Sequence, residues 1–405
     1  MAHLSLTTVA ALTPDEWDVT IHDNRVQRID PAAVEADLVG ITAFAAEIPD
    51  GYAVADAFRA KGTPVVMGGI HASALPDEAL QHADAVVAGE AEDIWAKVLE
   101  DFERGEMRGV YRAETHCDLK HQPVPRRELL ERERYITGFW TLQATRGCPF
   151  DCDYCAVTGV FGRKFRMRPV EHVIEEIRGF QGRDFFFVDD NICGNPKYAK
   201  ELFRRLAPLK KIWGGQTSIT FANDDELLSL YAKSGGRYAF IGLESVSDES
   251  LAGLNKGWCK ASEYKAAFDR IHAAGINILG SFIFGLDGDD PGVFDRTFDF
   301  ATSAGVDAAQ FYILTPFPGT RLYDQLEAEG RIIHRDWARY HAGECVIQPK
   351  QMSPEELERG YFRLYKRFYS YPNILRRVFR RPRGIPFRAL MNFGHRHRAM
   401  RMPDR

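Results

Sequence analysis

Three of the seven cysteines lie within eight residues, at Cys148, Cys152 and Cys155. Thiolates are soft ligands that bind zinc or iron–sulfur clusters. The spacing C-x3-C-x2-C has no further Cys or His close behind it, whereas structural zinc takes four protein ligands, typically in two pairs. Three thiolates would instead hold a [4Fe–4S] cluster and leave one iron free for another ligand. The alternatives are a zinc site completed by a distant His, and buried cysteines that hold no metal.

A strand is expected just before the cysteine motif, and it opens a long alternation of strands and helices. The expected strands are Thr141–Thr145, Phe185–Asp189, Ile212–Thr217, Tyr238–Leu243, Ile276–Phe284 and Ala308–Leu314. The helical patterns between them are Val170–Phe180, Lys197–Leu206, Asp225–Ser234, Ala261–Ala274 and Val293–Ala304. This alternation predicts a partial (β/α)6 barrel over residues 140–322, with its chemistry at the carboxyl ends of the strands.

The cysteine motif on the loop after the first barrel strand resembles the radical S-adenosylmethionine (AdoMet) superfamily. The resemblance implies that AdoMet binds the open iron through its amino and carboxylate groups. An electron from the cluster would then cleave AdoMet to methionine and a 5′-deoxyadenosyl radical, which abstracts hydrogen from the substrate. The same resemblance implies a reductase, flavodoxin or ferredoxin as the electron donor.

Other candidate AdoMet contacts lie in the cysteine motif or at the ends of the later strands. The resemblance places the methionine amino group near the acids after strand two, ribose near strand four, and adenosine near strands five and six. The candidates are Tyr154, Asp189, Asp190, Gln216, Ser218, Glu244, Gly280 and Thr315. Each has a structural alternative: a turn or helix cap for the aspartates, a surface ion pair for Glu244, and simple packing for the glycine.

The first 104 residues show a separate alternation of apolar runs and helical stretches. The expected strands are Val19–Ile21, Leu38–Thr42, Val65–Gly69 and Ala85–Gly89, with helices at Tyr52–Lys61 and Glu92–Arg104. This pattern predicts a doubly wound, Rossmann-like parallel sheet that binds ligands at the carboxyl ends of its strands. The charged stretch 105–139, with two prolines, is interpreted as a linker.

A doubly wound domain directly before such a barrel resembles the cobalamin-dependent radical AdoMet class, which includes hopanoid methylases and the anaerobic cyclase of chlorophyll synthesis. The resemblance implies that the front sheet binds a corrinoid and presents its cobalt to the barrel. The candidate cobalamin contacts are Thr42, Gly68, Gly69, His71, Gly89 and Glu90. For His71 a turn or capping role is an equal alternative. The D-x-H-x-x-G run that supplies a histidine ligand to cobalt in mutases is absent.

The chain begins almost inside its first expected helix, Ser5–Ala11, so we expect the first strand of the front sheet to be missing. Such a gap would leave unpaired backbone and an open ligand crevice. The remaining cysteines, Cys117, Cys193, Cys259 and Cys345, have no paired spacing. They therefore disfavour an auxiliary cluster and the methylthiotransferase relatives.

Residues 323–405 are expected to form a helical extension with a basic tail. Ser353, Pro354 and Glu356 supply an N-cap, a first-turn proline and a capping-box acid. After Ile374 there are ten arginines and a single acid, mixed with aromatic and aliphatic residues. Such a mixture can lie on an anionic membrane surface, whereas a solvated or disordered tail is the commoner outcome of this composition. No recognised module supports nucleic-acid binding.

Seven cysteines, three of them within eight residues, are typical of a metal site in a reducing compartment and not of a disulfide framework. The lack of a long apolar run disfavours a membrane span. We therefore expect a cytoplasmic protein, with peripheral contact at the inner membrane face as the alternative location. The main hypothesis is a cobalamin-dependent radical AdoMet enzyme that methylates an unactivated carbon of a small-molecule or lipid-like substrate. One alternative is a radical AdoMet cyclisation, oxidation or rearrangement, with or without cobalamin. Another is a zinc or iron–sulfur scaffold without catalytic activity.

Overall fold

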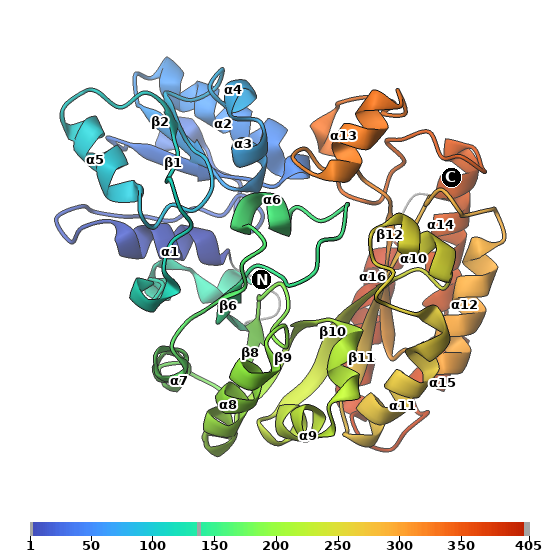
Figure 1. Cartoon of the computed structure of the whole chain (residues 1–405). Coiled ribbons are helices and arrows are strands. Elements are labelled where there is room, and N and C mark those ends of the chain that lie inside the picture. Colours follow the sequence, from blue (N-terminus) through green and yellow to red (C-terminus); the bar gives the residue numbers. More distant parts are fainter. Residues whose placement is uncertain (1–2, 136–138, 401–405) are drawn as a thin grey trace.

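The computed structural model describes residues 3–135 and 139–400. Figure 1 shows an N-terminal sheet domain beside a larger barrel-like sheet, with the C-terminal helices packed on the barrel. Both sheets are parallel, as the strand–helix alternation predicted.

The front sheet has four parallel strands in chain order: β1 (Val39–Thr42), β2 (Val65–Gly68), β3 (Ala85–Val87) and β4 (Gly109–Tyr111). Its helices are α1 (Leu4–Leu12), α2 (Ile48–Ala60), α3 (Ile70–Ala74), α4 (Pro76–Ala79) and α5 (Trp95–Glu103). Val66 and Val87 pack with Val98 and Leu99 of α5 on one face. Met67 and Val86 on the other face pack in the larger core with α2. Apolar side chains on both faces explain why the strands read as continuous hydrophobic runs.

Two expectations for this domain are corrected. Val19–Ile21 forms no strand, and within residues 3–135 nothing pairs with the outer edge of β1, whose Gly40 is exposed. The expected boundary at residue 104 falls too early, because Gly109–Tyr111 pairs with Ala85–Val87 as the fourth strand. Part of the expected linker therefore belongs to the sheet, and residues 136–138 of it lie outside the described residues.

The barrel sheet has six parallel strands: β5 (Trp140–Leu142), β8 (Asp184–Phe187), β9 (Ile212–Thr217), β10 (Gly236–Glu244), β11 (Asn277–Phe284) and β12 (Ala308–Ile313). Its helices are α7 (Val170–Arg178), α8 (Pro196–Leu206), α9 (Asp225–Lys233), α10 (Asp248–Gly253), α11 (Tyr264–Ala273) and α12 (Val293–Ala304). Each barrel strand pairs in parallel with the next barrel strand along the chain, which matches the expected six βα units.

The two faces of the barrel strands differ in burial. On β10, Ala239, Ile241 and Leu243 are fully buried, whereas the alternate residues Tyr238 and Phe240 are only half-buried. Because successive strand side chains point to opposite faces, the buried set packs on the outer helices and the half-buried set lines the inside. A closed barrel normally packs its interior with side chains. Here the inner face keeps contact with solvent.

A long excursion separates β5 from α7 and carries the cysteine motif. Its neck is a two-stranded antiparallel ribbon of β6 (Thr145–Arg146) and β7 (Arg166–Met167), in which Arg146 and Arg166 are register partners. Between them lie the cysteine loop and α6 (Val157–Phe161). Figure 1 shows α6 between the front domain and the barrel.

The C-terminal extension is helical, as expected: α13 (Arg321–Ala328), α14 (Pro354–Phe368), α15 (Tyr371–Val378) and α16 (Ile385–Ala399). The predicted capping box at Ser353 and Glu356 begins α14. Tyr369 donates to the carbonyl of Ala309, which joins the end of α14 to β12. Within the described residues, no helix is long and apolar enough to cross a bilayer.

Candidate functional site

Cys148, Cys152 and Cys155 lie half-buried on the loop that follows β6, and all three are free thiols. The amide of Cys155 donates to the carbonyl of Cys152 at 3.1 Å, which tightens the turn between them. Burial raises the pKa of Cys152 to about 11 and that of Cys155 to about 12. Buried thiolates therefore need a cation beside them, and a metal centre supplies one. Three thiols on one loop are the donor set of a site-differentiated [4Fe–4S] cluster.

The barrel holds this loop from several sides. Phe150 stacks on Trp258 at a ring-centroid distance of 3.6 Å. Arg321, the first residue of α13, bonds Asp151 at 2.9 Å and Asp153 at 2.7 Å. These contacts fix the backbone that carries the thiols, so the three sulfur positions are set before any metal binds.

The two aspartates after β8 have different roles. Asp189 is buried and accepts bonds from the amide of Ala144 at 3.1 Å and from the hydroxyl of Thr145 at 2.6 Å. Burial raises the pKa of Asp189 to about 7. Asp190 stays half-buried and accepts from the amide of Gly147 at 3.1 Å, next to the first cysteine. Asp189 thus braces the turn before the cysteine loop, whereas Asp190 contacts the backbone directly beside the first cysteine.

A buried ionic cluster lies beside the cysteine loop at the end of β10. Glu244 accepts from the Tyr154 hydroxyl and from the Lys256 ammonium, each at 2.8 Å. Ser281 of β11 donates to the other Glu244 oxygen at 3.4 Å. Burial alone would lower the pKa of Lys256, but Glu244 raises it above the usual value. The site therefore contains a fixed ammonium close to the thiols.

Backbone conformation makes room for this cluster. Glu244 has φ = 64°, where a non-glycine residue is strained, and it follows a register shift between β10 and β11. A Cβ on Gly242 would lie 2.3 Å from Glu244 Oε1, so this position needs glycine. Lys256 and Ser281 were missed by sequence reasoning. A lysine in a loop is normally solvated, so its residue type and spacing gave no signal.

The remaining AdoMet candidates divide into two groups. Gln216 is exposed at the end of β9, and the Ser218 hydroxyl accepts from Asn191, which also bonds Cys148. These lie at the carboxyl edge with the cysteine loop. Gly280 does not, because a Cβ there would meet Leu243 Cδ1 at 2.9 Å in the outer core. The buried Thr315 hydroxyl donates to the carbonyl of Ile313 at 3.0 Å, so only its backbone is free to meet a ligand.

Aromatic side chains line the inner face of the barrel. Phe186 stacks on Tyr238 at 5.7 Å, and Tyr238 stacks on Phe387 of α16 at 4.6 Å. Tyr238 and Phe387, with Phe240, Ile283 and Tyr312, are half-buried rather than closed off. The C-terminal extension thus adds an aromatic ring to the barrel interior, which sequence reasoning did not anticipate.

Several predicted cobalamin residues meet at the carboxyl edge of the front sheet. A Cβ on Gly69 (φ = 93°) would lie 2.3 Å from the Thr42 hydroxyl, so the two strand ends touch here. Ser73 bridges them to the next strand, since its hydroxyl donates to the Gly69 carbonyl at 2.7 Å and accepts from the Gly89 amide at 2.8 Å. A Cβ on Gly89 would meet nothing within 4 Å. Gly89 therefore borders open space where a corrinoid could approach the backbone.

His71 and Glu90 are engaged in protein contacts. His71 is buried, and its Nε2 lies 3.2 Å from Glu78 Oε1, which also accepts from Tyr52 at 2.8 Å and from Trp337 at 3.0 Å. Glu90 is buried between two arginines of the barrel. Both side chains thus make protein contacts, although the buried Nδ1 of His71 has no hydrogen-bond partner, and their assignment as corrinoid contacts stays a prediction. Gly68 ends β2 beside Val87.

The front domain and the barrel meet through small residues. A Cβ on Gly319, in the turn after β12, would lie 3.1 Å from the Cβ of Ala74 in α3. A Cβ on Gly159 of α6 would lie 2.9 Å from the carbonyl oxygen of Gly319. Because none of these positions carries a larger side chain, the front sheet's ligand edge, the cysteine loop and the end of β12 come together.

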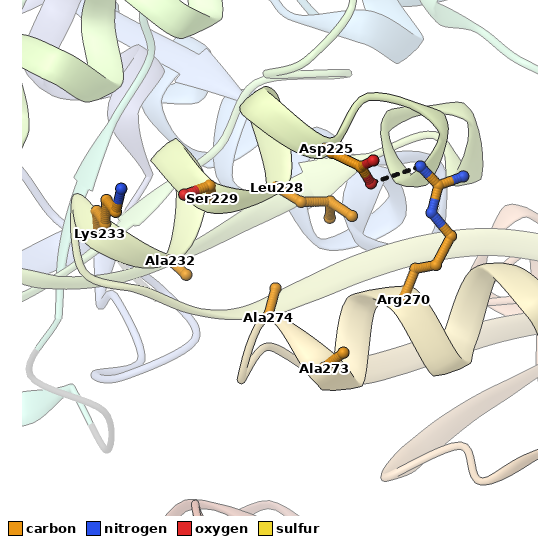
Figure 2. Close-up of a pocket in the computed structure, with 8 residues that line it drawn as sticks. All are labelled: Asp225, Leu228, Ser229, Ala232, Lys233, Arg270, Ala273 and Ala274. Atoms are coloured by element: carbon orange, nitrogen blue, oxygen red, sulfur yellow. Dashed lines mark hydrogen bonds and ion pairs between the residues drawn. The ribbon is translucent and has the colours of Figure 1, made fainter.

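A groove of about 430 Å³ lies elsewhere, on the outside of the barrel between α9 and α11 (Figure 2). The Asp225–Arg270 ion pair, at 2.7 Å, bridges it. None of its lining residues belongs to the predicted site, and it faces away from the carboxyl ends of the strands.

Comparison with known proteins places these features in context. Residues 142–301 match the model of the radical SAM superfamily, residues 1–99 match that of the B12 binding domain, and residues 320–397 match a domain of unknown function, DUF4070. The chain is 32% identical to bacteriochlorophyllide d C-12(1)-methyltransferase of Chlorobaculum tepidum, over 94% of this chain and 85% of the relative. It is 28% identical to hopanoid C-2 methylase of Rhodopseudomonas palustris, over 82% and 65%.

Among solved structures, the radical AdoMet methyltransferase TsrM from Kitasatospora setae, with cobalamin and a [4Fe–4S] cluster bound, superposes with a TM-score of 0.66. The match covers 88% of this chain and 82% of TsrM at 18% identity. Apo OxsB, a cobalamin-dependent radical AdoMet enzyme, gives 0.68 over 98% of this chain and 68% of its own, at 14% identity. At these identities the two structures support the fold.

Proposed function

The chain belongs to the cobalamin-dependent radical AdoMet family, and on that premise we propose that it methylates an unactivated carbon of an apolar, ring-bearing small molecule. The observation that carries the proposal is the meeting of the three-thiol loop with the ligand edge of the front sheet at the carboxyl ends of the barrel strands. The stacked rings of Phe186, Tyr238 and Phe387 line the inside of the same barrel, nearer the starts of the strands.

The residues present fit the three cofactors that the family uses. Cys148, Cys152 and Cys155 would hold the [4Fe–4S] cluster, and the half-buried loop leaves one side open for AdoMet. The Gly89 backbone, with open space beside it, would accept cobalamin. When bound, these groups supply radical generation and methyl transfer. The task of the protein is to hold them and to exclude water.

The side chains around the loop have definite positioning roles. Asp190 would accept hydrogen bonds from the AdoMet ammonium, and Lys256 would supply a fixed cation for the AdoMet carboxylate. Glu244 holds Lys256 and Tyr154 in place. None of these groups needs to exchange a proton with the substrate, which agrees with the absence of a recognisable acid–base dyad among the described site residues.

The aromatic inner face supports the proposed substrate class. Phe186, Tyr238 and Phe387 present ring faces that stack well on a flat apolar molecule. Two of the relatives are named for methylation of bacteriochlorophyllide and one for methylation of a hopanoid, which are ring-bearing and largely apolar. We therefore place the substrate between this face and the cysteine loop.

Anaerobic reconstitution tests the proposal. The purified chain should bind about four irons and one corrinoid, and after reduction it should release 5′-deoxyadenosine and S-adenosylhomocysteine with a methylated product. Release of 5′-deoxyadenosine alone, with a rearranged or cyclised product, would favour the non-methylating alternative. Zinc in place of iron would favour the scaffold.

Lys256→Met tests the positioning role of the buried ammonium. Loss of a charge-assisted contact to AdoMet should weaken AdoMet binding about 10-fold or more while iron content stays the same. Lys233→Met, on the outer groove, is the matched control and should leave AdoMet affinity unchanged. Equal AdoMet affinity in the two variants would remove Lys256 from the site.

The reaction also needs a one-electron donor, and we propose a flavodoxin, ferredoxin or dedicated reductase in the reducing cytoplasm. The seven free cysteines support such a compartment. Reduced flavodoxin should replace dithionite in the assay above if this is correct.

Peripheral membrane contact through the C-terminal helices is a further part of the proposal. Several arginines of the tail have internal partners, since Arg388 donates to main-chain carbonyls and Arg381 pairs with Asp307. The exposed surface nevertheless carries a stripe of Tyr371, Leu375 and Phe379 on α15, beside Leu390 and Phe393 on α16. An apolar stripe flanked by arginines suits an anionic bilayer surface. Leu375→Asp combined with Phe379→Asp should abolish co-sedimentation with phosphatidylglycerol vesicles.

A further inference from the structure

We propose that Glu90 is a positioning residue that links the cobalamin edge of the front sheet to the cluster loop, so that each cofactor strengthens binding of the other. This inference rests on the proposed pair of cofactors. It concerns residues that the reaction itself does not use. The link runs from the neck of the cysteine excursion, the β6–β7 ribbon, to Gly89.

Glu90 holds both arginines of that neck. Its Oε1 accepts from Arg146 at 2.7 Å and its Oε2 accepts from Arg166 at 2.7 Å. Arg146 and Arg166 are register partners in the β6–β7 ribbon, which closes the excursion carrying the cysteines and α6. A single front-domain carboxylate therefore joins the two strands through which the cluster loop leaves and re-enters the barrel.

Few residues separate this contact from the proposed cofactor site on either side. Arg146 stands two residues before Cys148, and Arg166 also donates to the carbonyl of Phe161, the last residue of α6. On the other side, Glu90 follows Gly89, whose backbone borders the open space at the ligand edge. Movement of the neck is thus transmitted to Gly89 through one side chain and one peptide bond.

The contact is also buried from solvent and constrained by several partners. The side chains of Glu90, Arg146 and Arg166 are each at most 8% exposed. Burial alone would raise the pKa of Glu90, but hydrogen bonds from Arg166 and Arg146 hold it below the usual range. Glu92 pairs with Arg146 at 2.5 Å, and the Cys117 amide donates to Glu90 at 3.1 Å. A buried carboxylate with this many partners has one favourable position, so it transmits a displacement rather than absorbing it.

The same chain contains a matched control. Glu176 of α7 is also buried between two arginines, with Arg127 at 2.5 Å and Arg168 at 2.6 Å. Arg127 lies in the segment between the front sheet and the barrel, and neither partner belongs to the neck ribbon. Arg168 directly follows β7 and donates to the carbonyl of Gln143, so this triad supports the base of the same neck. Glu176→Gln therefore breaks the same kind of triad but leaves the Glu90 contacts with Arg146 and Arg166 in place.

Thermodynamic linkage provides the test, because coupling between two sites appears as a ratio of affinities. Hydroxocobalamin is titrated into the full chain with and without a reconstituted cluster, and iron is counted in each sample. The wild type should bind hydroxocobalamin about 10-fold tighter when the cluster is present. The ratio should fall below about 2 in Glu90→Gln and stay near 10 in Glu176→Gln, within the usual range of coupling.

The milder Arg166→Lys keeps a cation beside Glu90 but loses the geometry, and its ratio should fall between those of the wild type and Glu90→Gln. If Glu90→Gln does not fold, Arg166→Lys alone tests whether this contact couples the two sites. The proposal is overturned if the wild type binds hydroxocobalamin equally well with and without the cluster, so that the ratio is near 1. It is also overturned if Arg166→Lys and Glu90→Gln keep the same ratio as the wild type. Either result leaves the proposed function intact. If the wild type binds iron but no corrinoid, both the coupling proposal and the proposed function are overturned. The absence of corrinoid absorbance identifies this outcome.

Discussion

The cluster loop and the ligand edge of the front sheet are the two proposed cofactor sites, and they differ in the groups that they offer a ligand. The cluster loop offers side chains, since three thiols would bind the metal while Arg321, Trp258 and Lys256 hold the loop in place. The front edge relies on backbone, where Gly69 takes φ = 93° against Thr42 and Gly89 faces open space. A metal needs particular donor atoms, whereas a large flat cofactor mainly needs room and exposed peptide groups.

We therefore expect the cluster loop to be sensitive to the type of residue, and the front edge to be sensitive to the size of the side chain. At the loop, the identity of the atom decides binding, so removal of sulfur should be decisive. At the front edge, the added volume of a side chain decides binding, so small residues should be decisive. Glu90 lies where the two regions meet and should respond to both charge and geometry.

The largest effect is expected for combined replacement of Cys148, Cys152 and Cys155 by Ala. Iron should fall from about four per chain to background, since no thiolate remains to hold the cluster. Hydroxocobalamin should still bind, with the affinity of the cluster-free wild type. Iron analysis and corrinoid absorbance measure the two separately. Retention of the cluster would show that the loop is not its site and would break the comparison.

Glu90→Gln should lower the free energy of unfolding by about 3–5 kcal/mol at pH 7, because two buried guanidinium groups lose their counter-charge. The folded state holds the pKa of Glu90 below its usual range, so its contribution is complete at neutral pH. That contribution is lost as the pH falls through the folded pKa. The difference between wild type and variant should therefore shrink on acidification below about pH 4.

Urea melts of both proteins at several pH values check this expectation. A difference that stays constant from neutral to strongly acidic pH would mean that the Glu90 carboxylate is not the stabilising group. Glu176→Gln provides the comparison in the barrel, where a similar loss of stability is expected from its own two arginines.

Gly69→Ala and Gly89→Ala sharpen the comparison within the front edge. Both residues have positive φ, but a Cβ on Gly69 would overlap the Thr42 hydroxyl, whereas one on Gly89 meets nothing within 4 Å. Gly69→Ala should cost about 2–4 kcal/mol in unfolding free energy, and Gly89→Ala about 1 kcal/mol. Gly89→Ala should instead weaken hydroxocobalamin binding more than it weakens folding. The opposite ranking in thermal melts would show that the edge is not packed as described.

The smallest effect is expected for Lys233→Ala in the groove between α9 and α11. The change should shift the free energy of unfolding by no more than about 0.5 kcal/mol, as for other exposed positions, and should leave both cofactors bound. A loss of iron or corrinoid in this variant would mean that the outer helical layer controls the site.

The sequence by itself determined the strand–helix order and most element positions, and it predicted the cysteine site. Thiolate spacing is local, and the alternation of apolar runs depends on neighbours close in the chain, so both could be read from residue types. The helix Val293–Ala304 and the strand Ile212–Thr217 have the predicted bounds. The capping box at Ser353 is likewise a local pattern.

The tertiary structure alone decided which polar residues brace the fold and which lie beside the cysteine loop. Asp189 and Asp190 are adjacent in the sequence, but only the structure shows one braced against Thr145 and the other left beside the cysteine loop. Val19–Ile21 has a strand composition but no strand to pair with, and Glu90 and Lys256 found partners more than ten residues away. Burial and ion pairing depend on segments that are distant in the chain, so no local pattern contains them.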